Sequence, residues 1–234
     1  MTSPLPVPGP APAGLPRRDV AARTVLADVA GRTRPVTAAH ERLLAVSGAL
    51  GARLPGGGLR RGATVTVGGA VGAGATSVVL ALAAAAAAAG EWVAVVEAGE
   101  TFGALAAAEA GVDLRRCAVV RRVPAERWAT VVAALLDGIG LVCAEVPRGV
   151  RAADARRLVA RARERDVVLV AVEREATWPA EAALRIRAGG GAWSGLAAGE
   201  GVLDDRTVRV AVTGRGVAPD AAGRGAPVAL VRAG

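Results

Sequence analysis

The sequence predicts an α/β fold built on a mostly parallel, doubly wound sheet, with antiparallel edge strands at its C-terminal end. Short apolar segments alternate with helical segments from residue 64 to residue 172, which is typical of parallel strands joined by crossover helices. A glycine-rich loop separates the first strand from a long alanine-rich helix. After residue 182 the rhythm changes to two strands joined by a loop, which predicts a hairpin-like edge added to the sheet.

Four regions are predicted along the chain. Residues 1–16 are rich in proline and predict a disordered arm. Residues 17–53 predict a helical N-terminal segment, with helices over Asp19–Ala30 and Thr37–Leu50. Residues 54–214 form the predicted core domain, and residues 215–234 predict a flexible basic tail.

Within the core, each predicted strand is a short apolar run and each predicted helix is a longer segment. The predicted strands are Thr64–Val67, Trp92–Val96, Cys117–Val120, Leu141–Ala144, Val167–Val172, Leu184–Ala188 and Thr207–Thr213. The predicted helices are one that begins near Thr76, then Phe102–Ala110, Ala125–Asp137 and Ala152–Arg165.

The glycine-rich loop has the spacing of a phosphate-binding loop, G-x-x-x-x-G-K-[ST]. Such a loop presents backbone N–H groups to an anion at a helix N-terminus. Ala75 stands where the motif has lysine, and the chain contains no lysine at all. The pattern therefore predicts a vestigial nucleotide site formed by Gly69, Gly72, Gly74, Ala75, Thr76 and Ser77. The competing interpretation is that these glycines only let the strand and the helix pack closely.

A second ligand class also matches the loop. The glycines Gly68, Gly72 and Gly74 resemble the dinucleotide loop of short-chain dehydrogenases, and Glu97 ends the next strand, where such proteins bind a ribose. Those enzymes act through a tyrosine and a lysine, and this chain has neither. A catalytic dehydrogenase is thereby excluded, and a nicotinamide-dinucleotide-binding α/β protein stays as a further hypothesis.

Composition constrains the compartment and the chemistry. The first residues lack a basic segment and are interrupted by prolines, so no signal peptide is predicted. The helix after Thr76 is one or two turns short of a bilayer and predicts a buried helix without membrane contact. Cys117 and Cys143 lie in predicted buried strands, which favours reduced thiols in the cytoplasm over a disulfide or a metal site. His40 is the only histidine, so no metal site and no histidine-based catalysis is predicted.

The net charge of +8 lies mainly at the two ends of the chain. Residues 1–61 hold nine arginines and three acidic residues, residues 62–206 hold sixteen and seventeen, and residues 207–234 hold four and one. Basic ends predict contacts with DNA or an acidic partner, and solvated arginines in a GC-rich protein are the alternative. The candidate DNA- and partner-binding residues are Arg17, Arg18, Arg60, Arg61, Arg215, Arg224 and Trp193. Two interpretations of Trp193 stay open: packing under the final strands, and an anchor that binds a partner.

The segment Leu54–Gly62, which leads into the first core strand, resembles the entry into the RecA-type ATPase core. Within that superfamily the chain is most similar to the ImuA-type accessory proteins of GC-rich bacteria, including the actinobacterial ones. The similarity covers about Thr37–Gly216 and includes Leu184-Arg185-Ile186-Arg187, Trp193-x-Gly195-Leu196 and Gly214-Arg215-Gly216. It implies a RecA-like P-loop core.

Carried over position by position, the resemblance implies a damaged ATPase site. Thr76 keeps the hydroxyl that would hold Mg²⁺, whereas the loop lysine is absent. A water-activating glutamate is expected near Glu97–Glu100, but Gly99 lies at its place. Glu145 follows the strand that would carry the magnesium-binding acid. No catalytic residue and no cofactor are therefore predicted, with ATP and Mg²⁺ bound weakly at most.

The resemblance implies a non-catalytic accessory protein of damage-induced (SOS) translesion synthesis. Its implied partners are an inactive Y-family polymerase-like protein and an error-prone C-family polymerase, with DNA as a further candidate. The alternative is an active ATP-dependent DNA-binding ATPase in which Arg60 or Arg61 replaces the missing lysine.

Overall fold

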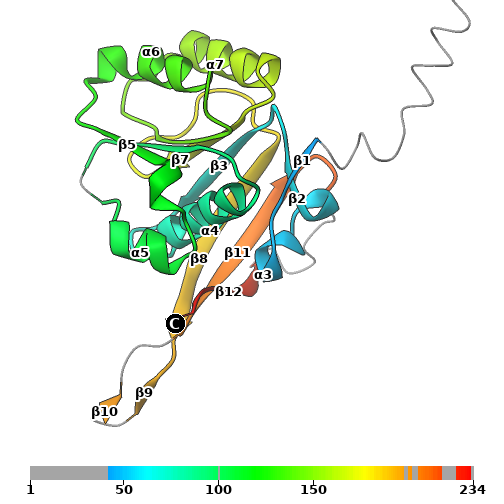
Figure 1. Cartoon of the computed structure of the whole chain (residues 1–234), viewed down its shortest axis with the longest axis vertical. Helices are drawn as coiled ribbons and strands as arrows, with labels where there is room; N and C mark the ends of the chain where they lie inside the picture. Colours follow the sequence, from blue (N-terminus) through cyan, green and yellow to red (C-terminus); the bar gives the residue numbers. More distant parts are fainter. Residues whose placement is uncertain (1–41, 100, 198–199, 202–204, 218–224, 233–234) are drawn as a thin grey trace, which may run out of the picture. The chain divides into compact units, whose positions relative to one another are not determined.

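A computed structural model describes residues 42–99, 101–197, 200–201, 205–217 and 225–232 (Figure 1). The predicted proline-rich arm, the predicted helix Asp19–Ala30 and the candidate residues Arg17, Arg18 and Arg224 lie outside these described residues.

The central sheet has eight strands in the order β12-β11-β8-β3-β7-β6-β4-β5. The six strands from β8 to β5 run parallel to one another, and β11 and β12 are antiparallel additions at one edge. The predicted fold class, an α/β protein with a mostly parallel sheet and antiparallel edge strands, is thereby confirmed. The strands are β3 Thr64–Gly69, β4 Val93–Glu97, β5 Cys117–Arg121, β6 Leu141–Glu145, β7 Val168–Glu173, β8 Leu184–Trp193, β11 Asp205–Gly214 and β12 Ala226–Arg232.

The crossover helices also lie where apolar periodicity predicts them. They are α4 Ala75–Ala88, α5 Ala104–Glu109, α6 Ala125–Leu135 and α7 Ala152–Glu164. Short 3-10 turns precede β2 (η1, Pro55–Gly57) and β5 (η2, Leu114–Arg116). The inner strands β3, β4 and β6 are buried along almost their whole length, as expected for parallel strands covered by helices on both faces.

Two apolar clusters lie on opposite faces of the sheet. In β4, Val93 and Val95 belong to one cluster and Ala94 and Val96 to the other, because successive strand residues point to opposite faces. The first cluster contains α4 and Ala107 of α5, and the second contains α6, α7 and the segment 176–182. Figure 1 shows α6 and α7 side by side above the sheet and α4 on its other side.

The chain before the glycine loop differs from the predicted helix Thr37–Leu50. Residues Leu43–Ala45 form strand β1, which pairs antiparallel with β2 (Gly58–Arg60), and α3 covers only Gly48–Gly51. Gly58 permits this pairing, since a Cβ there would collide with the backbone oxygen of Leu44. The apolar residues Leu44 and Leu50 are buried as expected, but Leu44 lies in strand β1 and Leu50 in the short helix α3 rather than in one continuous helix.

The C-terminal region also differs from its prediction in part. The predicted antiparallel strands over Leu184–Ala188 and Thr207–Thr213 are confirmed as parts of β8 and β11. A short pair, β9 (Leu196–Ala197) and β10 (Glu200–Gly201), lies between them. The predicted flexible tail is wrong for Ala226–Arg232, which form the edge strand β12, with Val228 buried.

Among the described residues, no helix has both the length and the apolar character needed to cross a membrane.

Candidate functional site

The carboxyl ends of the parallel strands form the candidate site. After β4 the chain enters α5 on one face, whereas after β6 it enters α7 on the other face. Neighbouring strands whose connections leave in opposite directions create a crevice at their carboxyl ends, where open α/β sheets bind ligands. Glu97 ends β4 and Glu145 ends β6, so both predicted acids border this crevice.

The glycine loop lies at the same edge, between β3 and α4. Gly72 and Gly74 have positive φ angles of 78° and 103°, which glycine adopts without the penalty of a Cβ. A Cβ on Gly74 would lie 2.6 Å from Cγ2 of Val208 on β11. Gly69 is packed as closely, because its Cβ would lie 2.5 Å from the backbone oxygen of Ala188. The glycines at 69 and 74 therefore have a packing role, but it is against the neighbouring strands β8 and β11 rather than between β3 and α4.

The outer rim of the loop is held by β11. The Arg206 guanidinium donates to the backbone oxygen of Gly72 and lies over the ring of Trp193, 5.1 Å from its centroid. Trp193 is 49 % exposed, so it is not packed under the final strands. The predicted anchor residue thus lies beside the glycine loop, on the extension of β8.

Behind the loop, an arginine occupies the position between the two residues expected to share a metal ion. Arg174 follows β7, and its Nη2 donates to Oγ1 of Thr76 at 2.8 Å. Its Nε lies 3.4 Å from Oε1 of Glu145. The hydroxyl and the acid that would share Mg²⁺ in a phosphate-binding loop are therefore bridged by a fixed cation. With Ala75 in place of lysine as well, these residues do not fit a magnesium–nucleotide complex.

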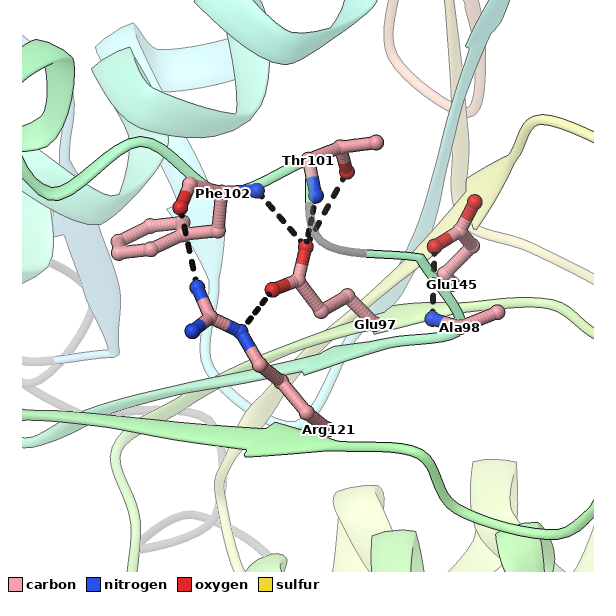
Figure 2. A network of polar contacts seen from close by, with 6 residues as sticks. All are labelled: Glu97, Ala98, Thr101, Phe102, Arg121 and Glu145. Carbon is pink, nitrogen blue, oxygen red and sulfur yellow. Dashed lines mark hydrogen bonds and ion pairs between the residues drawn. The ribbon is translucent and has the colours of Figure 1, made fainter.

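Glu97 organises the loop that follows β4 (Figure 2). One carboxylate oxygen accepts hydrogen bonds from the backbone N–H of Thr101 at 2.8 Å and of Phe102 at 2.7 Å. The other accepts from Nε of Arg121 at 2.6 Å, and Arg121 also donates to the backbone oxygen of Phe102. Glu145 accepts from the backbone N–H of Ala98 at 2.9 Å. Both acids are thus engaged in holding backbone groups of Ala98, Thr101 and Phe102.

These contacts set the charge of Glu97. Burial alone would raise the pKa of this carboxyl, since only 4 % of its side chain is exposed. The hydrogen bonds from Arg121, Phe102 and Thr101 outweigh burial and hold the pKa below its ordinary value of 4.5. Glu97 is therefore a charged structural acceptor, and it lacks the raised pKa that a general base or acid near neutral pH needs.

A pocket of about 370 Å³, counting the space open to solvent, lies between α4 and the ends of β4, β6 and β7. Its wall is largely apolar, and its polar groups are those already paired: Glu97, Glu145, Thr101, Thr76 and Arg174. Cys143 lines the pocket from β6, and burial raises the pKa of its thiol to about 12. Both cysteines are free, and the described residues contain no group of acids, cysteines and histidines that could hold a metal ion.

The other predicted site residues are dispersed. Ser77 is buried in the first turn of α4. Arg60 ends β2, and Arg61 pairs with Glu91 at 2.6 Å, before β3 and β4 begin. Six residues of β3 separate them from the glycine loop, about 20 Å at strand rise, so the suggestion that Arg60 or Arg61 replaces the loop lysine is wrong. Arg215 is exposed after β11, and its N–H donates to the oxygen of Ala183.

Sequence reasoning missed Arg174 and Arg206. Arg174 had a usable signal, because it comes two residues after the end of the predicted strand Val167–Val172 and so belongs at the carboxyl edge with Glu97 and Glu145. Arg206 had none, since its place beside Gly72 depends on β11 crossing back to the loop across 134 residues of sequence.

No curated protein matches the chain. A family model, described as the MT3502 N-terminal domain, matches residues 52–180, which cover the glycine loop, the crevice and every strand from β3 to β7. The chain belongs to the MT3502 N-terminal domain family.

Proposed function

We propose that this protein is a non-catalytic accessory protein of damage-induced translesion synthesis, with a RecA-like core that serves as a scaffold. The observation that carries the proposal is the bridge from Arg174 to Thr76 and Glu145. Arg174 is tethered to the end of β7, so the two groups that would orient Mg²⁺ each have its guanidinium as a partner. Support for the RecA-like core comes from the glycine loop after a central parallel strand and from the antiparallel edge strands.

The partners follow from the resemblance to ImuA-type proteins. They are an inactive Y-family polymerase-like protein and an error-prone C-family polymerase, with DNA as a further ligand. A scaffold of this kind needs an intact fold and exposed contact residues, and it needs no nucleotide chemistry. Trp193 fits such a role, since a half-exposed tryptophan beside an arginine is a common anchor in protein interfaces.

Nucleotide chemistry is tested by calorimetry with Mg-ATP and by phosphate release. We expect the native chain to show neither binding nor turnover. Ala75→Lys together with Arg174→Ala restores the missing ammonium and frees Thr76 and Glu145, so this double variant should gain Mg-ATP binding. Ala75→Lys alone is the matched control and should gain less, because the guanidinium still occupies the metal position.

The opposite result would favour the alternative function. Turnover by the native chain that is lost on Thr76→Ala would identify an ATP-dependent enzyme, and its loss on Arg174→Ala as well would assign the role of the loop lysine to Arg174. The partner half of the proposal is tested by co-expression with the two polymerase-type proteins. Failure of the full-length chain to co-purify with either of them would contradict the scaffold role.

A further inference from the structure

No described helix covers one face of the sheet at β8 and β11. Residues Ile186, Val210 and Val212 point toward α4 and are buried. The alternate residues point the other way, and Arg185, Arg187 and Arg209 among them are exposed. We call these three side chains the arginine face.

The helices that cover this side of the sheet do not reach the arginine face. The second apolar cluster draws its strand residues from β4, β6 and β7, its helical residues from α6 and α7, and further residues from the segment 176–182. It includes no residue of β8, β11 or β12. Thr213, opposite Arg185, and Pro227 on β12 are exposed as well. Within the described chain, this part of the sheet therefore has one packed face and one open face.

The register of β8 and β11 places the three arginine residues in a row along the sheet. Arg185 lies opposite Thr213, and Arg187 lies opposite Ala211. Arg209 lies two residues before Ala211 on β11, which runs antiparallel to β8. The three arginines are therefore spaced by about 7 Å along the strand direction. The pairing shifts between Val208 and Val210, and a Cβ on Gly189 would lie 3.9 Å from Cβ of Arg209, which places that side chain on the same face.

The charge of this row is mostly unmatched. Arg187 lies 3.9 Å from Glu173, whose other oxygen accepts from the N–H of Trp178. Neither Arg185 nor Arg209 makes a hydrogen bond or an ion pair recorded among the described residues. Three exposed guanidinium groups on neighbouring strands attract an extended anion, and a phosphate backbone offers one charge per 3.4 Å of axis on each strand of B-DNA.

We propose that the arginine face binds the phosphate backbone of DNA. The proposal rests on the function proposed above and deepens it by naming the surface that meets DNA. The face offers guanidinium and hydroxyl groups, and the register turns Trp193 toward the glycine loop instead. The contact therefore reads phosphates and no bases, so binding is independent of sequence. It adds a contact surface within the folded core to the contacts with DNA expected from the basic ends of the chain.

The test measures fluorescence anisotropy of the full-length chain with labelled 20-base-pair duplexes of two unrelated sequences, over a salt series. The variant replaces Arg185, Arg187 and Arg209 with alanine. We expect it to bind at least about tenfold more weakly near physiological salt, and the slope of log K against log salt to fall by about 2 to 3. The lysine triple variant keeps the charges and should bind nearly as the native chain does.

The matched control removes three exposed arginines from α7, by Arg156→Ala, Arg157→Ala and Arg163→Ala. It changes the net charge equally and should leave affinity and salt slope close to native. The proposal fails if the arginine-face variant binds as the native chain does, if the control loses as much, or if the native chain binds neither duplex. Co-purification with polymerase-type partners and the absence of ATP turnover are scored separately, so failure here leaves the scaffold role standing.

Discussion

The crevice at the carboxyl edge and the arginine face both contain arginines, but only the crevice matches each one with an acid. Arg121 pairs with Glu97 at 2.6 Å, and Arg174 lies 3.4 Å from Glu145. On the arginine face, Arg187 has only Glu173 at 3.9 Å. Charges that are paired and partly buried stabilise loops, whereas exposed unpaired charges contribute little to folding and remain available to a partner. The comparison separates arginines that hold the fold from arginines that can meet DNA.

Among the substitutions predicted to change stability, the largest loss of unfolding free energy is expected in the crevice. Glu97→Ala leaves the N–H groups of Thr101 and Phe102 without their acceptor and should lower the free energy of unfolding by about 3 kcal/mol. Urea unfolding followed by circular dichroism measures it. Glu175→Ala is the control, because that acid also pairs with an arginine, Arg148, but at an exposed site, and it should cost less than about 0.5 kcal/mol. Equal losses of unfolding free energy for both variants would show that the buried ion pair of the crevice stabilises the fold no more than an exposed one.

The next largest loss of stability is expected from substitutions in the glycine loop. Gly74→Ala puts a Cβ 2.6 Å from Val208 at a φ of 103° and should cost about 2 kcal/mol. Gly72→Ala meets no atom within 4 Å and should cost about 1 kcal/mol, from its φ of 78° alone. Thermal unfolding of the two variants compares them. If both cost the same, packing against β11 does not explain why glycine is needed at 74.

Lowering the pH should reduce the stability of the fold, because Glu97 loses its charge on protonation. Its pKa is lower in the folded chain than its ordinary value of 4.5, so the unfolded chain binds the proton more readily. The stabilisation is therefore complete well above pH 4.5 and is lost as the pH falls through the folded pKa. In urea unfolding between pH 7 and pH 3, the free energy of unfolding should fall less steeply with decreasing pH for Glu97→Gln than for the native chain. Parallel curves would mean that other carboxyls account for the acid dependence.

The smallest change in stability is expected for the arginine-face variant. Arg185→Ala, Arg187→Ala and Arg209→Ala should each change the free energy of unfolding by less than about 0.5 kcal/mol, because the side chains are exposed. Denaturant midpoints measured beside the DNA titrations would check this. If the triple variant lost several kcal/mol of unfolding free energy, the arginine face would support the fold as the crevice does.

Much of the fold could be predicted from local sequence alone. The alternation of apolar runs and helical segments predicted the strands from Thr64 to Val172 and the helices between them, since a buried parallel strand must be apolar along its whole length. Glycine spacing predicted the loop, and the order of strand ends predicted that Glu97 and Glu145 share one edge of the sheet. Each of these inferences uses only residues close in sequence.

Other features depend on contacts between distant parts of the chain. Leu43–Ala45 is a strand because Gly58–Arg60 pairs with it, and Ala226–Arg232 is a strand because β11 offers an open edge. Arg174 reaches Thr76 across 98 residues, so the bridge in the metal position exists only once β7 lies beside β3. The sequence determined which residues are apolar, charged or glycine. The tertiary structure decided which charges meet, because strand order and register place side chains that no local pattern relates.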